Sequence, residues 1–292
     1  MRVVAGLVGR NLRLFFRDRL NVFFSMLSGL ILFFLYTLFL ARLQVDGLAE
    51  TLPQASPSDI EAFVASWMLS GIVLLTTVTA GIGALSSLVD DRATGRFADF
   101  LVAPIRRTHL VLGYLLSAIA VAVIMSTIIL VLTVLYLGFV HGTWIAPVDI
   151  LAALAAMLLC CAAFTALAAF GASFLRTAGA YSAFATVVGT ILGFVAGAYI
   201  PVGSLPPGVA STINALPFAQ GAMLMRRPFT HETLAAVSGG VPQAESSLAT
   251  FYGVDIFVGD AQVSGWVAVL VLAVMAVGFT ALAAGRVRSL LR

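Results

Sequence analysis

The chain has 292 residues, of which 61% are hydrophobic and only 10% are charged, and its formal net charge is +3. The segments outside the apolar runs are too short for a soluble domain of about 100 residues, which excludes a soluble enzyme. The composition predicts an all-α integral membrane protein with a single membrane domain, residues 1–292.

Residues 1–19 predict an amphipathic helix that lies on the membrane surface. With about 100° of rotation per residue, its arginines fall within an arc of roughly 80°, and a set of apolar residues lies on the far side. The arginines are Arg2, Arg10, Arg13 and Arg17, and the apolar residues are Val4, Val8, Leu12 and Phe15. The apolar run that follows is long enough for a full span, so we expect an anchor rather than a cleaved signal peptide.

Six runs without Asp, Glu, Lys or Arg are each long enough to cross a bilayer, whose hydrocarbon core takes about 20 helical residues. The predicted transmembrane helices are residues 20–41, 62–89, 110–140, 150–175, 180–200 and 261–285. An even number of spans places both termini on the same side of the membrane.

The arginines predict which side this is. Thirteen of the sixteen arginines fall in the two termini and in the connecting segments on the same side as the termini. Because cytoplasmic segments retain positive charge during insertion, we expect both termini in the cytoplasm of a multi-pass plasma-membrane protein. Anionic lipid of the inner leaflet accounts for these arginines, so membrane lipid is the expected partner and no nucleic acid is needed.

Residues 90–109, between the second and third spans, predict a short helix on the cytoplasmic side. Phe97, Phe100 and Leu101 recur at helical spacing between charged flanks, and Pro104 ends the pattern. On pattern alone, the alternative is a solvated connector whose apolar face rests on the bilayer surface.

Several prolines interrupt the chain after the fifth span. The apolar pieces 209–216 and 218–225 are each too short to cross the hydrocarbon core. Because unpaired backbone is not tolerated in lipid, we expect residues 201–225 to form an external re-entrant hairpin that neighbouring helices shield. Residues 226–260 then form an external segment to which the sequence assigns no role.

The fifth span contains a stripe of glycines at every fourth position, namely Gly189, Gly193 and Gly197. Small residues at this spacing allow helix backbones to approach closely. The stripe predicts a helix contact, either with another helix of the same subunit or across a dimer.

Three kinds of chemistry are disfavoured by residue types that the chain or its spans lack. The chain contains no lysine, so it has no Walker A loop and cannot by itself be a P-loop ATPase. The predicted spans contain no Asp, Glu, His or Arg at depth, which disfavours catalysis within the membrane and proton relays. Sodium-coupled carriers that use hydroxyl groups stay open, because Thr76, Thr77, Thr79, Ser126 and Thr127 lie within spans.

The loop after the second span resembles the intracellular loop of permease subunits of type-2 ABC exporters, of the bacterial multidrug and antibiotic type. The matching residues are Asp91-Arg92, Gly95, Phe100-Leu101, Pro104, Arg106-Arg107 and Gly113. Two positions depart from the family pattern, because Asp91 stands where Glu is commoner and Tyr114 stands where Lys commonly follows the glycine. The N-terminal helix and the predicted hairpin resemble the same family, so the resemblance covers nearly the whole chain except residues from about 230 to 259.

The resemblance implies that the loop is a coupling helix that docks into a separate ABC ATPase. The residues that it assigns to this contact are Asp91, Arg92, Gly95, Arg96, Asp99, Phe100, Leu101 and Pro104. It implies a non-catalytic permease that pairs with a second permease, identical or related, and with two copies of the ATPase. The first and fifth spans would then flank the dimer contact and the substrate path, which places the glycine stripe at the dimer.

The resemblance also implies the function. The permease would export an amphipathic substrate, such as a drug, lipid or peptide, across the plasma membrane. ATP and Mg would bind to the ATPase subunit, and this chain would hold no cofactor or metal. A secondary carrier or channel without an ATPase partner is the alternative, and a membrane-anchoring or assembly subunit without a pathway is a third interpretation.

Overall fold

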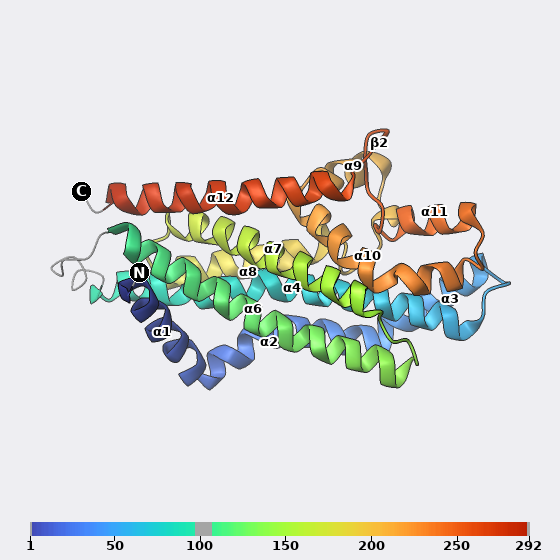
Figure 1. Cartoon of the computed structure of the whole chain (residues 1–292), viewed down its shortest axis with the longest axis horizontal. Coiled ribbons are helices and arrows are strands. Elements are labelled where there is room, and N and C mark those ends of the chain that lie inside the picture. Colours follow the sequence, from blue (N-terminus) through green and yellow to red (C-terminus); the bar gives the residue numbers. More distant parts are fainter. Residues whose placement is uncertain (1, 97–106, 291–292) are drawn as a thin grey trace.

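The computed structural model describes residues 2–96 and 107–290, which form a long bundle of helices (Figure 1). The elements in chain order are α1 (Arg2–Arg17), α2 (Arg19–Leu35), the π-helical turn η1 (Tyr36–Leu40), α3 (Ala41–Thr51), α4 (Pro57–Ala93), α6 (Arg107–Val140), α7 (Pro147–Ala172), α8 (Ala178–Val195), the 3₁₀ turn η2 (Val202–Ser204), α9 (Pro207–Asn214), α10 (Pro217–Val237), α11 (Pro242–Phe251), β1 (Phe257–Val258), β2 (Ala261–Gln262) and α12 (Gly265–Leu290). The two short strands pair antiparallel, Phe257 with Gln262.

Within the described ranges, six helices are long and apolar enough to cross a membrane, which confirms the predicted all-α membrane fold. They are Gly29–Thr51, Pro57–Ala93, Thr108–Val140, Pro147–Ala172, Ala178–Val195 and Gly265–Arg286. Both termini lie at one end of the bundle, together with the end of α4 and the start of α6 (Figure 1). We call this the termini end. Helices α3 and α11 and the strand pair lie toward the opposite end.

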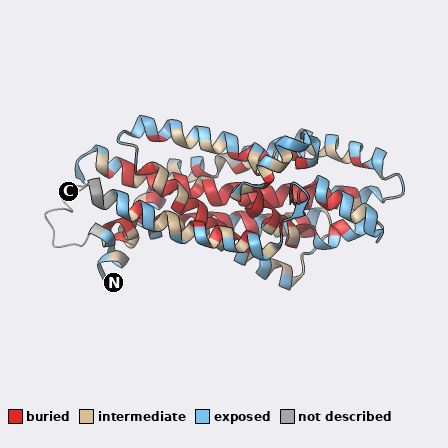
Figure 2. Ribbon diagram, turned by 90° about the horizontal axis from the view of Figure 1, so that it is seen from above, coloured by how far each residue is buried: buried red, intermediate tan, exposed pale blue. Residues whose placement is uncertain are grey.

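Helix α4 forms the centre of the bundle. In its most apolar window 78% of the residues are buried, whereas the figure is only 17% for the first and fifth spans and 22% for the last. The buried residues follow the axis of the bundle (Figure 2). A helix that is apolar on all sides needs neighbours on all sides, and α4 packs against α2, α6, α7, α8 and α10. At Gly81 an added Cβ would lie 2.3 Å from the Thr165 hydroxyl, so α4 and α7 approach closely there.

The first span extends further than its apolar run predicts. Instead of ending near residue 41, the helix continues through η1 and α3 to Thr51. Residues 41–51 contain no proline, and the chain stops being helical only shortly before Pro53. The Tyr36 hydroxyl in η1 donates to the carbonyl oxygens of Ala198 and Tyr199, at 2.7 and 2.8 Å, which joins this helix to the end of the fifth span.

The fifth span is shorter than predicted, because α8 ends at Val195 rather than near Ile200. Gly197 has a φ of 61°, a conformation that favours glycine, and the amides of Ala198 and Tyr199 donate to the Gly193 carbonyl. Gly197 therefore terminates the helix and lies outside it.

The predicted boundary at residues 225 and 226 falls inside a helix. Helix α10 runs without interruption from Pro217 to Val237, although Pro228 lies within it. With α9 it forms the two arms of a helical hairpin, while the rest of residues 226–260 consists mainly of α11 and β1. That the hairpin enters the membrane stays a prediction.

A buried arginine, Arg226, connects these parts. Its side chain donates to the carbonyl oxygens of Ala196 and Gly197, both at 2.7 Å, and of Gly253, at 3.3 Å. Its guanidinium also lies 5.6 Å from the centre of the Trp67 ring of α4. Burial lowers the pKa of Arg226 to about 10, so the group stays charged near neutral pH. The carbonyl oxygens at the end of α8 carry partial negative charge and compensate this buried cation.

We predict that Arg226→Met destabilises the protein by about 3 kcal/mol, because it leaves buried carbonyl groups without donors. Arg227→Met is the matched control, since Arg227 is about one third exposed and pairs with Asp255 at 2.6 Å, an interaction worth at most about 1 kcal/mol. Thermal unfolding in detergent measures both variants. Equal melting temperatures would contradict the role given to Arg226.

Candidate functional site

The candidate site is a polar cluster at the termini end, centred on Asp91 near the end of α4. Asp91 is only 3% exposed. One oxygen of its carboxylate, Oδ2, accepts hydrogen bonds from Arg10 Nη1 of α1 at 2.8 Å and from the Tyr114 hydroxyl of α6 at 2.6 Å. The other oxygen, Oδ1, lies 3.7 Å from Arg96 Nη1. A single carboxylate therefore connects α1, α4 and α6.

The cluster extends along α1. Arg10 Nη1 also donates to Asn11 Oδ1 at 3.0 Å, and Asn11 Nδ2 donates to the Ser117 hydroxyl of α6 at 3.2 Å. Leu7 lies against Gly113, where an added Cβ would come within 2.7 Å of it. Glycine at position 113 thus lets α1 pack directly on α6.

The buried face of α1 differs from the predicted apolar face. Leu7, Asn11 and Phe15 are buried, whereas Val4, Val8 and Leu12 are only half-buried. The sequence pattern found the amphipathic helix but missed the polar contact at Asn11, which requires a partner on α6. Arg10 likewise turns inward to Asp91, while Arg2, Arg13 and Arg17 stay exposed.

The electrostatics of the cluster favour its charged form. The hydrogen bond from Arg10 to Asp91 raises the pKa of the Arg10 guanidinium above its ordinary value, and this outweighs the opposing effect of burial. A buried ion pair is stable only where further hydrogen bonds satisfy it, and Tyr114 supplies one to the carboxylate. Removing Arg10 or Asp91 takes away the shortest ion pair of the cluster, at 2.8 Å.

Four of the residues predicted to couple to an ATPase lie within the described ranges: Asp91, Arg92, Gly95 and Arg96. Arg92 Nη1 donates to the carbonyl oxygens of Ser173 and Leu175 after α7, at 3.1 and 3.4 Å. Gly95, with a φ of 76°, follows the end of α4. Asp91 and Arg92 thus have partners inside the chain, and Arg96 lies 3.7 Å from Asp91 with its side chain 64% exposed. Their contact with an ATPase stays a prediction.

The other four, Asp99, Phe100, Leu101 and Pro104, lie outside the described residues. Sequence reasoning missed Arg10 and Tyr114 as partners of Asp91, and it missed the hydrogen bond between Asn11 and Ser117. The sequence contained one indication of the cluster, because Asp91 and Tyr114 are the two positions that depart from the family pattern. These two side chains bond to each other.

A groove of about 580 Å³ lies between α2, α4 and α8. Its polar lining consists mainly of hydroxyl groups, from Ser25, Thr79, Ser86, Ser182, Thr186 and Thr190, with the Asn21 amide. Phe24, Ile31 and Tyr199 are among its apolar and aromatic residues. Such a lining suits a ligand with both apolar and hydrogen-bonding parts. The hydroxyls of Ser25, Thr79, Thr186 and Thr190 donate to carbonyls of their own helices, as those of Thr76 and Thr77 do. Their oxygens are therefore left as hydrogen-bond acceptors.

The glycines of the fifth span have different surroundings. Gly189 lines the groove, and an added Cβ there would meet nothing within 4 Å among the described residues. At Gly193 an added Cβ would lie 2.0 Å from the Tyr199 ring of the same chain, and Gly197 ends the helix. Gly189 is therefore the position of the predicted stripe with open space beside it; a dimer contact there stays a prediction.

Comparison with protein families gives a match to the model described as ABC-2 type transporter, over residues 3–228. The chain belongs to the ABC-2 type transporter family. In this ABC transporter permease the match contains α1 from its second residue, all of α2 to α9 and the first part of α10. Helix α11, the strand pair and α12 lie beyond it. Comparison with curated proteins finds no matching sequence.

For this ABC-2 permease we predict that Asp91→Asn loosens α1 from the bundle. The neutral amide loses the ionic part of the contact with Arg10, whose side chain is about one third exposed. Hydrogen exchange of the α1 backbone amides should accelerate about tenfold. Asp90→Asn is the control, because Asp90 is exposed and forms no ion pair with another described residue. Unchanged exchange in Asp91→Asn would contradict this role.

Proposed function

We propose that this permease is the membrane half of an ATP-driven exporter in the plasma membrane, with both termini in the cytoplasm. Two copies of a separate ABC ATPase bind ATP and Mg and dock at the termini end, and a second permease completes the pathway. The observation that carries the proposal is the Asp91 cluster, which joins α1, α4 and α6 beside the predicted coupling loop.

The cluster supports a route for mechanical coupling. The predicted coupling loop begins at the end of α4, and α4 is also the central helix of the bundle. A displacement of the loop by the ATPase therefore moves α4 together with α1 and α6. Helix α4 packs on α2 and α8, and these helices line the groove with it. Docking of the ATPase and the position of the helices that line the groove are thus linked through α4.

The lining of the groove supports the proposal that the substrate is amphipathic, such as a drug, lipid or peptide. Its lining combines hydroxyl groups with aromatic and aliphatic side chains. The groove lies on the least buried helices, α2 and α8, so a second permease packed against this side covers it. Export rather than import rests in this proposal on the resemblance to type-2 ABC exporters, while the positive-inside orientation places the ATPase in the cytoplasm.

The coupling loop provides the first test. We predict that Leu101→Asp abolishes retention of the ATPase during purification, because it places a charge in an apolar contact that costs several kcal/mol, on the order of 2–4. Val258→Asp is the control, since Val258 is 37% exposed and lies in the strand pair away from the termini end.

The same pair of variants separates exporter from carrier. Leu101→Asp should insert and express normally but no longer transport, while Val258→Asp keeps both ATPase and transport. If Leu101→Asp transports normally and no ATPase accompanies the wild-type protein, the chain is a carrier or channel that needs no ATPase.

The dimer provides a second test. We predict that Gly189→Leu weakens pairing of the permeases at least about tenfold, because the leucine fills space that a second permease occupies. Gly278→Leu in α12 is the matched control, since an added Cβ there also meets nothing within 4 Å in the part of the chain that the structure describes. Cross-linking in membranes measures both. Equal pairing in the two variants places the dimer contact elsewhere.

A further inference from the structure

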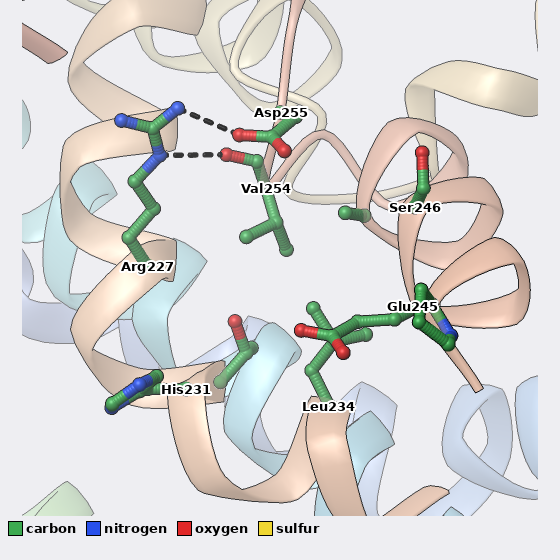
Figure 3. Close-up of a pocket in the computed structure, with 10 residues that line it drawn as sticks. Arg227, His231, Leu234, Glu245, Ser246, Val254 and Asp255 are labelled. Carbon is green, nitrogen blue, oxygen red and sulfur yellow. Dashed lines mark hydrogen bonds and ion pairs between the residues drawn. The ribbon is translucent and has the colours of Figure 1, made fainter. Parts of the chain in front are cut away.

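A cavity of about 530 Å³, separate from the groove, lies between α10 and α11 (Figure 3). It lies toward the end of the bundle opposite the termini. Its lining includes Arg227, His231, Leu234, Glu245, Val254 and Asp255. All but Arg227 lie beyond the matched family region, which ends at residue 228. The volume is typical of pockets that bind small organic molecules.

The positive group of this cavity is already compensated. Arg227 Nη2 donates to Asp255 Oδ1 at 2.6 Å, and Arg227 Nε donates to the Val254 carbonyl at 3.2 Å. An anionic ligand would therefore have to displace Asp255 from this ion pair. His231 also has an acidic partner, with Nδ1 at 3.2 Å from Asp149 Oδ2.

Glu245 is the charged side chain of the cavity that has no oppositely charged partner among the described residues. Its carboxylate projects from α11 into the space between α11 and α10 (Figure 3). No hydrogen bond or ion pair between described residues engages it. Glu245 lies in the first turn of α11, where the helix dipole stabilises a negative charge. Apolar side chains, among them Leu234 and Val254, form the walls beside it.

We propose that this cavity binds a protonated amine with an apolar body. The ammonium group donates hydrogen bonds to Glu245, and the apolar body lies against Leu234 and Val254. An organic anion is disfavoured, because it faces Glu245 and finds Arg227 occupied. The site goes beyond the proposed export function, since binding to the purified permease needs neither an ATPase nor transport. A failure here therefore leaves the proposed function standing.

The test measures binding of dansylcadaverine, which joins a fluorescent aromatic body to a primary ammonium, to the full chain in detergent. The comparison ligand is dansyl-aminohexanoate, which carries a carboxylate in place of the ammonium. We expect saturable binding of the amine, at least about tenfold weaker in Glu245→Gln, since a charge-assisted hydrogen bond is lost. Glu232→Gln is the matched control, because Glu232 is exposed on α10 and does not line the cavity.

Charge reversal gives an independent test. Glu245→Lys should lose the amine and bind the carboxylate ligand instead, because the uncompensated charge in the cavity is now positive. Equal affinity of the amine for the wild type and Glu245→Gln would overturn the proposal, since the dye then binds only to detergent or elsewhere. Equal binding of both ligands by the wild type would overturn it as well.

Discussion

The structure depends on the compensation of the buried carboxylate of Asp91. This charge lies near the end of the helix that forms the centre of the bundle, where only 3% of the residue is exposed. A carboxylate is not stable in such a place unless strong donors surround it, and Arg10 and Tyr114 supply them from two other helices. The need to pair one charge thus fixes the positions of α1 and α6 beside the predicted coupling loop.

A second buried charge, Arg226, has the corresponding role away from the termini end. Its partners are backbone carbonyls rather than a carboxylate, and it lies over Trp67 of α4. Trp67 in turn donates to the Tyr252 carbonyl at 2.8 Å. Helix α4 is therefore held by charged and polar contacts near both of its ends, and residues 68–89 between them carry no charge. This arrangement suits a helix that transmits a displacement along its axis.

Hydropathy predicted the number of spans and the fold class, because crossing a bilayer demands long apolar helices and little else. Helix ends were less predictable, since Gly197 stops α8 through its backbone conformation and α3 continues the first helix without an apolar run. The cluster was not predictable, because Arg10 and Asp91 are 81 positions apart in the sequence. Only the unusual identity of Asp91 and Tyr114 pointed to it.

The central claim is that an ATPase docks at the termini end beside the Asp91 cluster. The most direct measurement places a photo-reactive benzoylphenylalanine at Arg96, whose side chain is 64% exposed, or at Glu50, which is exposed on α3 toward the opposite end. Irradiation of cells that express the complete transporter should attach a chain with a Walker A motif to position 96 and none to position 50. Attachment of that chain at position 50, or at neither position in an actively transporting membrane, would contradict the account.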